Sequence, residues 1–287
     1  MRENAICPYC GNTISENDSS IDHIIPKQLG GPEKFKVISC ITCNNKISKI
    51  EQSSMRTLTA NWLMAQMYED GFEIKGRRKR NLIPLQKEVG VGFNAPVKFY
   101  YDTKKKEKVL MILSPPQFPL NKDFLKDGSF VTITPVSAYE EDTNEKMSLT
   151  SLTNKIILGS CTWLWGDKFS KTKQADELRE RMWNPDFDKI IEMKPSDKHI
   201  EHPNKPGVDA LENRPHHTIL IGLITANMGI GIFNLFGSYE SSTVISEVDD
   251  DFKKMINKLG IVLIPKTTKN EVLKMTWQEY EKFKLKS

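Results

Sequence analysis

The distribution of apolar residues near the N-terminus predicts two short strands followed by a helix. Ile24–Pro26 and Lys36–Ser39 are short apolar runs, and Leu29–Pro32 between them has the glycine and proline content of a turn. From Asn44 onward, apolar residues recur close to helical spacing, at Ile47, Ile50, Leu58, Trp62 and Ala65. We therefore expect a strand–strand–helix module, with its trailing helix, over residues 1–70.

The pattern changes at Val97, and residues 97–287 read as a second, mixed α/β domain. A β-hairpin with a lysine-rich tip is predicted over residues 97–113. The remaining predicted elements are a strand at 129–136, helices at 151–165 and 175–183, a polar loop at 184–213, strands beginning at 216, 229 and 242, a helix at 249–259, a strand at 261–264 and a helix at 276–286. The expected fold class is α+β, and we expect the second domain to serve recognition, sensing or partner docking.

Composition and charge add a few constraints. A net charge of +4 is mildly basic, which fits a polyanionic partner without requiring one. No apolar run is long enough to cross a membrane and no secretory leader opens the chain, so we expect a cytoplasmic protein without a membrane partner. Of the five cysteines, Cys161 stands apart and is expected to be buried as a small hydrophobic residue.

Two Cys-x-x-Cys pairs bracket the two predicted strands. The four residues are Cys7, Cys10, Cys40 and Cys43. Four thiolates suit a tetrahedral Zn²⁺ ion, and each pair would aim two sulfurs at one point. The alternatives are four unrelated thiols or two disulfides, and a reducing compartment disfavours disulfides. Four protein ligands leave no open position, so we expect a structural zinc that supplies much of the module's folding energy.

An Asp–His dipeptide and two asparagines form a second candidate site. Asp22 and His23 precede the first predicted strand, and Asn44 and Asn45 directly follow Cys43. Carboxylate and amide oxygens suit Mg²⁺ or Mn²⁺, and an imidazole beside such an ion can take a proton from water at neutral pH. The set fits phosphodiester hydrolysis. An Asp–His pair alone is more often part of a surface turn, and its place between the cysteine pairs is what favours a site.

Together these motifs resemble the HNH endonucleases, or ββα-metal nucleases, in their four-cysteine zinc form. The resemblance rests on the DHIIP, LGG and CxxCNN segments and covers residues 5–52. It implies that Asp22 binds a catalytic metal, that His23 is the general base, and that Asn44 is a further metal ligand, with Asn45 in that role if the helix register differs. It also implies that the four cysteines hold structural zinc in a zinc-stapled ββα-metal module.

One position departs from the family pattern. The middle asparagine of the family, which braces the hairpin loop, falls where this chain has Phe35. The family asparagine is mainly structural, so its loss removes no metal ligand, but the positioning of His23 is left without an explanation. A degenerate, inactive domain is therefore an alternative.

Residues 71–96 read as a connector that carries the densest positive run of the chain. The basic residues are Lys75, Arg77, Arg78, Lys79 and Arg80. Such a run can neutralise DNA phosphates and make binding salt-dependent. A solvated linker that binds nothing has the same composition. We favour contact with DNA phosphates because the run lies close in sequence to the N-terminal module.

The sequence thus predicts a metal-dependent DNA endonuclease, in the setting of a bacterial restriction or anti-phage effector. A single site of this kind cuts one strand, so a double-strand break requires a homodimer or two encounters. A homodimer or a partner protein is the expected binding partner of the C-terminal domain. The rival hypothesis is a zinc-stapled module that binds nucleic acid or protein without catalysis. The two hypotheses differ in whether His23→Ala abolishes metal-stimulated cleavage.

Overall fold

The fold is taken from a computed structural model of the 287-residue chain. The structure describes residues 6–57, 61, 64–65, 82–84, 90–92, 95–112, 143–185, 208–209, 214–215, 217–235, 239–256, 260–266 and 270–286. The chain divides into two units, of which one joins Met1–Met55 with Thr143–Ser287 and the other is Arg56–Asp142. This division differs from the predicted boundaries at residues 70 and 97, because the N-terminal module packs against the C-terminal part of the chain.

The N-terminal module, residues 6–57, is a β-hairpin followed directly by a helix. Strands β1 (Ser19–His23) and β2 (Lys36–Cys40) pair antiparallel, with Asp22 opposite Val37. Helix α1 (Ile41–Ser54) begins where β2 ends, and the Cys40 side chain accepts a hydrogen bond from the Cys43 amide at its N-terminus. Short 3₁₀ turns, η1 (Glu16–Asp18) and η2 (Lys27–Leu29), flank β1. The predicted strand–strand–helix order is confirmed.

Two elements of this module have bounds that differ from the predicted ones. The first strand is Ser19–His23 and not Ile24–Pro26, and its one apolar residue, Ile21, is 50% exposed, so apolar content does not reveal it. Ile24 and Ile25 are fully buried in the bend after the strand. Helix α1 starts at Ile41, three residues before Asn44, and ends at Ser54, where the spacing had suggested a continuation to Ala65.

The C-terminal block consists of helices α3–α7 and a five-stranded sheet. The helices are α3 (Thr143–Trp165), α4 (Asp167–Ser170), α5 (Lys173–Trp183), α6 (Asp250–Ile256) and α7 (Trp277–Lys286). The sheet has the order β11-β10-β9-β12-β13, with β9 (Thr218–Thr225), β10 (Met228–Leu235), β11 (Tyr239–Ile245), β12 (Ile261–Lys266) and β13 (Glu271–Thr276), all antiparallel. A two-stranded pair, β7 (Val208–Asp209) and β8 (Arg214–Pro215), precedes it. The overall α+β class is confirmed, whereas β13, with its mixed polar sequence, was missed.

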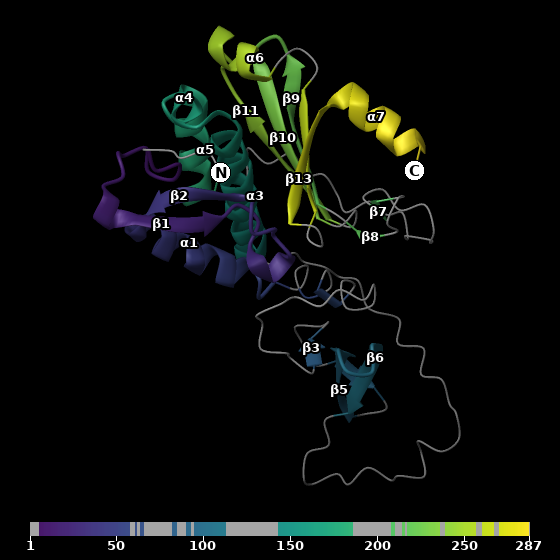
Figure 1. Cartoon of the computed structure of the whole chain (residues 1–287). Helices are drawn as coiled ribbons and strands as arrows, with labels where there is room; N and C mark the ends of the chain where they lie inside the picture. Colours follow the sequence, from purple (N-terminus) through teal and green to yellow (C-terminus); the bar gives the residue numbers. More distant parts are fainter. Residues whose placement is uncertain are drawn as a thin grey trace. The chain divides into compact units, whose positions relative to one another are not determined.

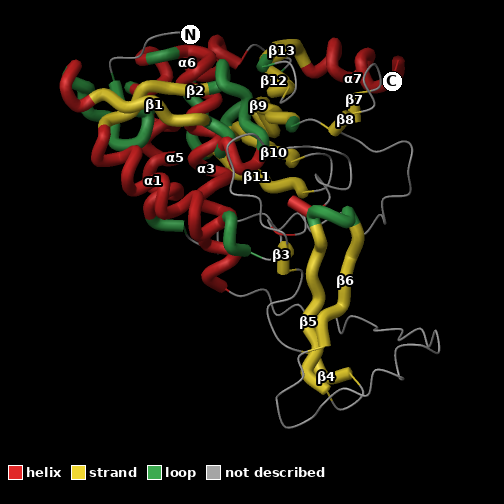
Figure 2. The backbone as a smooth tube through the Cα atoms, turned by 60° about the horizontal axis from the view of Figure 1, so that its bottom comes forward, coloured by secondary structure: helices red, strands yellow, loops and turns green. Residues whose placement is uncertain are grey.

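Helix α3 lies between the N-terminal module and the sheet (Figure 1 and Figure 2). It contacts α1 and β2 on one side and β9, β10 and β11 on the other. Helix α3 packs so close to the sheet that a Cβ on Gly231 of β10 would lie 2.6 Å from Ile157 Cγ2 of α3. Cys161 on this helix is fully buried, as predicted. Helix α3 therefore carries residues of the C-terminal block into contact with the module.

The second unit contains a small antiparallel sheet. Its strands are β3 (Leu82–Pro84), β4 (Gly90–Gly92), β5 (Ala95–Asp102) and β6 (Glu107–Ile112), and the β5–β6 hairpin confirms the predicted one. The side chain of Asp102 accepts hydrogen bonds from the Lys104 and Lys105 amides in its lysine-rich tip. The basic run at residues 75–80 and the strand expected at 129–136 lie outside the described residues.

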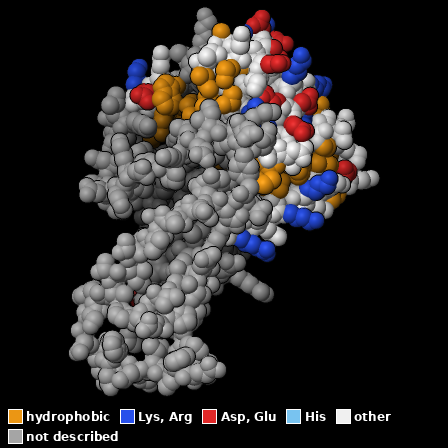
Figure 3. Space-filling model, turned by 180° about the vertical axis from the view of Figure 1, so that it is seen from behind, with side chains coloured by type: hydrophobic (Ala, Val, Ile, Leu, Met, Phe, Trp, Pro, Cys, Tyr) orange, Lys and Arg blue, Asp and Glu red, His pale blue; other side chains and the backbone are white. Residues whose placement is uncertain are grey.

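Two surface properties bear on binding partners. In the described part of the chain, no helix has the length and apolar character that a membrane span requires. Figure 3 shows that both acidic and basic side chains occur on the described surface seen there.

Candidate metal centre and active site

The four cysteines converge on one point. Their Sγ atoms all lie within 4.8 Å of one another, and Cys10 Sγ is 3.9 Å from Cys40 Sγ. Tetrahedral zinc with Zn–S bonds of about 2.3 Å places its sulfurs about 3.8 Å apart, so the spacing fits this ion. The first pair sits in a turn closed by the Gly11 amide on Cys7 O at 2.9 Å, and the second joins β2 to α1.

The thiols interact strongly with one another. A hydrogen bond with Cys43 lowers the pKa of Cys7 to about 5, whereas the same contact and burial raise the pKa of Cys43. Backbone amides of Cys40 and Cys43 point at Cys7 Sγ and Cys40 Sγ, each at 3.4 Å, as they do toward thiolates. A dication bound between the four sulfurs would stabilise all of them as thiolates. The cluster therefore fits structural zinc.

Asp22 is held at the inner face of the hairpin. It is 5% exposed, and its Oδ2 accepts a hydrogen bond from the hydroxyl of Tyr9, which lies between Cys7 and Cys10. Burial and the neighbouring Asp22 carboxylate raise the pKa of Tyr9 well above its ordinary value, so the phenol stays protonated and donates. The first cysteine pair thus places a hydrogen-bond donor directly on the candidate metal-binding acid.

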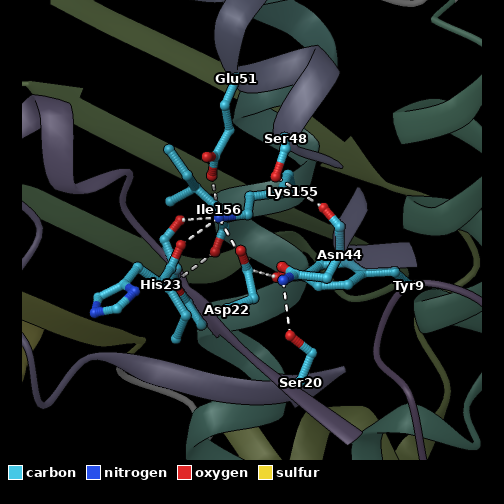
Figure 4. A network of polar contacts seen from close by, with 11 residues as sticks. Tyr9, Ser20, Asp22, His23, Asn44, Ser48, Glu51, Lys155 and Ile156 are labelled. Carbon is cyan, nitrogen blue, oxygen red and sulfur yellow. Dashed lines mark hydrogen bonds and ion pairs between the residues drawn. The ribbon is translucent and has the colours of Figure 1, made fainter. Parts of the chain in front are cut away.

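Lys155 of α3 enters the same site. Its Nζ lies 2.9 Å from Asp22 Oδ2 and 2.9 Å from Glu51 Oε1 of α1. It also donates to Ile24 O at 3.0 Å and to His23 O. Burial lowers the pKa of this lysine, but Asp22 and Glu51 outweigh burial and the pKa is raised. Figure 4 shows the ammonium group at the centre of this network of oxygens.

His23 follows Asp22 on β1 and therefore points to the other face of the hairpin. Figure 4 shows its ring directed away from the Asp22 carboxylate. Its side chain is 16% exposed, and Nε2 lies 3.1 Å from Glu33 Oε2. Hydrogen bonds from Lys27 and His23 lower the pKa of Glu33 to about 2, so Glu33 is a carboxylate at neutral pH. A carboxylate accepts the Nε2–H, which leaves Nδ1 as the basic nitrogen.

Asn44 lies on the side of α1 that faces β1. Its Nδ2 donates to Ser20 Oγ at 2.8 Å, and Ser20 lies two residues before Asp22 on the same face of the strand. Asn45 is exposed. Glu51 lies two helical turns beyond Asn44 on the same side of α1, which Figure 4 shows. The helix register therefore puts Asn44, and not Asn45, next to the Asp22 face.

The turn between the strands is braced by backbone hydrogen bonds and by Phe35. The Ile24 amide donates to Phe35 O at 3.0 Å, and the Gly31 amide donates to Pro26 O at 3.2 Å. A Cβ on Gly31 would lie 1.9 Å from Ile25 O, so only glycine fits there. Phe35 is fully buried and meets the Trp163 ring of α3 edge-on, with centroids 5.5 Å apart. Packing on α3 thus replaces the amide bracing expected of the family asparagine.

Sequence reasoning missed several residues of the site. Tyr9, Glu33, Glu51 and Lys155 reach it from four different segments. The one sequence signal for Lys155 is that it is the single lysine in the apolar stretch 151–165, which forms the greater part of α3. The basic residues Lys75, Arg77, Arg78, Lys79 and Arg80 lie outside the described residues, so their contact with DNA stays a prediction.

Comparison with known proteins supports the resemblance. The family model described as HNH endonuclease matches residues 7–59. Searches of curated proteins and of solved structures gave no match. The matched segment contains the four converging cysteines, the β1–β2 hairpin and all of α1. The chain therefore carries, at its N-terminus, a domain of the HNH endonuclease family in the form with four cysteines placed to bind a metal ion.

Proposed function

We propose that the chain is a metal-dependent endonuclease that hydrolyses phosphodiester bonds of DNA at the site formed by Asp22, His23 and Asn44. The observation that supports it best is the state of three side-chain atoms. Among the described residues, Asp22 Oδ1, the Asn44 side-chain oxygen and His23 Nδ1 have no hydrogen-bond partner, whereas the opposite atom of each group is held. Each side chain is thus oriented with one atom left to bind a ligand.

The donor set fits a hard divalent cation. Asp22 and Asn44 would hold Mg²⁺ or Mn²⁺ through a carboxylate and an amide oxygen, with positions left for water and phosphate. Such an ion, when bound, stabilises negative charge on the scissile phosphate and on the leaving oxygen. Structural zinc on the four cysteines keeps the hairpin and helix in register and takes no part in the chemistry.

His23 supplies the base. Glu33 holds the Nε2–H, so Nδ1 accepts a proton from the attacking water. Because His23 and Asp22 point to opposite faces of β1, the His23 imidazole does not coordinate the ion that Asp22 would bind, and its nitrogen stays available as a base. The Glu33 contact supports an oriented, functional histidine over the degenerate alternative, since Glu33 provides the positioning that Phe35 does not.

The biological setting belongs to the same proposal. We infer a bacterial restriction or anti-phage effector, and its support is the family resemblance together with the attached C-terminal block. The mild positive charge of +4 suits a nucleic-acid substrate.

The test is cleavage of supercoiled plasmid by the purified full chain in EDTA, Mg²⁺ or Mn²⁺, with an RNA of similar length as a second substrate. We expect nicking that requires the metal and is absent in Asp22→Asn purified in parallel. Equal cleavage by wild type and Asp22→Asn would refute the assigned site. Cleavage of RNA without cleavage of DNA would refute the substrate class.

A matched pair of variants tests the metal ligand. Asn44→Ala should raise the Mn²⁺ concentration for half-maximal cleavage by about tenfold or more, the effect seen even for groups that only support a ligand. Asn45→Ala, one residue further and exposed, should behave as wild type. The reverse result would assign the ligand to Asn45.

A further inference from the structure

Lys155 is a buried lysine that the proposed chemistry does not use. Its side chain is 0% exposed, and lysine is almost never fully buried unless it is paired. Four oxygens surround its ammonium group: Asp22 Oδ2, Glu51 Oε1, His23 O and Ile24 O. We call these four atoms the oxygen cage. Figure 4 shows that carboxylates and carbonyls approach Nζ from different sides.

The lysine comes from outside the HNH domain. The family match ends at residue 59, and Lys155 lies on α3 of the C-terminal block. The same block holds the first cysteine pair, because Arg179 Nε donates to Pro8 O and Trp183 Nε1 donates to Tyr9 O, each at 2.8 Å. The geometry of Asp22 therefore depends on helices that are distant in the sequence.

Lys155 and Tyr9 act on the same oxygen of Asp22. Both contact Oδ2, so the rotation of the carboxylate is set and Oδ1 is the oxygen that remains. The lysine also holds the backbone at His23 O and Ile24 O, the two carbonyls that follow Asp22. One side chain thus fixes the acid and the peptide groups beside the general base.

Charge and chemistry explain why this position needs a cation. Two carboxylates and one ammonium leave a net charge of −1, which still attracts a divalent ion. Carboxylate and carbonyl oxygens are hard ligands, so without the ammonium group the oxygen cage would itself receive a divalent ion. Stability alone is a weak reason for having charged groups here, because a buried ion pair can often be replaced as a whole by apolar residues at no cost, whereas removal of one partner alone is destabilising.

We propose that Lys155 is a positioning residue of the site: it fills the oxygen cage and fixes Asp22, so that a catalytic divalent ion binds through Oδ1 together with Asn44. This inference rests on the proposed function. It assigns the C-terminal block a direct part in building the site, in addition to any role in recognition. The cation inside the oxygen cage is the ammonium group of Lys155. The catalytic divalent ion, which exchanges with solvent, would bind outside the cage.

The test compares the full chain with Lys155→Met, which keeps the length of the side chain and removes its charge. Asn154→Ala is the matched control: it is the next residue on α3, is 1% exposed, and contacts Thr243 of the sheet and not Asp22. Zinc content and thermal unfolding establish that each variant is folded. Cleavage is measured against Mn²⁺ concentration, and bound Mn²⁺ is examined by electron paramagnetic resonance.

We expect Lys155→Met to bind Mn²⁺ at least as tightly as wild type, because a positive charge is removed and the oxygen cage is opened. Its cleavage rate at saturating Mn²⁺ should nevertheless fall by about tenfold or more, since a misplacement of about 1 Å can cost that much. Asn154→Ala should lose stability but cleave at close to the wild-type rate. The Mn²⁺ spectrum should change in Lys155→Met and not in the control.

Several results would overturn the inference. They are wild-type or faster cleavage by folded Lys155→Met, full recovery of its rate at high Mn²⁺, or an equal loss in Asn154→Ala. If Lys155→Met does not fold, Tyr9→Phe decides, because it removes only the other hydrogen bond on Oδ2. Reduced cleavage at saturating Mn²⁺ in Tyr9→Phe supports the role of a fixed Oδ2, and an unchanged rate refutes it.

Failure of the proposed function is distinguishable from failure of this inference. If the wild type does not cleave at all, the endonuclease proposal fails. The Mn²⁺ spectra then decide the inference alone: an altered metal environment in Lys155→Met, absent from Asn154→Ala, supports the positioning role, and identical spectra overturn it.

Discussion

Phe35 departs from the family pattern, yet the hairpin that carries Asp22 and His23 is formed. The position calls for an asparagine that braces the hairpin loop, and the sequence alone offers no substitute. In the structure, Phe35 is fully buried against Trp163, and its backbone holds Ile24. Glu33, two residues earlier, contacts His23. Phe35 thus braces the hairpin loop and Glu33 orients His23. No pattern of apolar positions predicts this division of roles.

Restoring the family residue should therefore destabilise the protein. Phe35→Asn removes a buried ring and buries an amide without a partner, so we expect a loss of about 3–5 kcal/mol in the free energy of unfolding. Urea denaturation measures it. Ile21→Asn, at a 50% exposed position of the same hairpin, is the control and should change the free energy by about 0.5 kcal/mol or less. A stabilised Phe35→Asn would contradict the packing role.

Glu33 should affect catalysis and not stability. Its side chain is 53% exposed, so Glu33→Gln should change the free energy of unfolding by only about 0–1 kcal/mol, the usual contribution of exposed ion pairs. Cleavage should slow about tenfold, a part of the 10²–10⁴-fold that a general base contributes, because Gln does not hold the His23 tautomer as a carboxylate does. Glu107→Gln is the control, since Glu107 is 54% exposed and also pairs with a lysine. Equal cleavage rates for the two variants would show that Glu33 does not orient His23 for catalysis.

At the scale of elements, the sequence predicts what depends on short-range pattern. The cysteine spacing predicts the metal centre, the long apolar stretch at 151–165 predicts α3, the charged segment at 175–183 predicts α5, and short apolar runs predict most strands of the sheet. The apolar pattern does not predict β1, because Ser19, Ser20 and the exposed Ile21 give this strand no apolar face. The strand forms because it pairs with β2 and lies between the two cysteine pairs. The pattern also fails for β13, whose exposed residues alternate poorly.

A zinc ion bound by the four cysteines should control how the module packs on α5. Trp183 Nε1 donates a hydrogen bond to Tyr9 O, which lies between the first two cysteines. Lys46 Nζ of α1 lies 5.9 Å from the centre of the Trp183 ring. Removing zinc with a chelator should release this turn and shift tryptophan emission to longer wavelength, because Trp183 becomes exposed to water. Added Zn²⁺ should reverse the shift and Mg²⁺ should not. An unchanged emission spectrum in a zinc-free sample would contradict a structural role for the metal.

At the scale of the whole molecule, the module and the C-terminal block form one unit. Lys155, Arg179 and Trp183 all reach into the module, and His217 Nε2 lies 2.7 Å from Leu29 O. The sequence suggests a boundary near residue 70 because the motif-bearing segment looks self-contained. These contacts join residues more than 100 positions apart, and nothing in local composition or periodicity encodes such pairings.

A fragment of residues 1–70 should accordingly fail to form a stable domain even with zinc. It lacks the lysine that neutralises Asp22 and Glu51 and the ring that covers Phe35. We expect poor amide dispersion in its nuclear magnetic resonance spectrum and rapid proteolysis, in contrast to the full chain. A well-dispersed spectrum from the zinc-loaded fragment would show that the module folds independently.

The most direct test of the central claim is the rate of plasmid nicking by His23→Ala relative to wild type, at equal zinc content and saturating Mn²⁺. His23 is only partly buried, and among the described residues its side chain contacts only Glu33, so we expect the variant to fold and bind DNA normally. We expect a loss of about 10²–10⁴-fold, the usual contribution of a general base. Nicking by His23→Ala at the wild-type rate would contradict it.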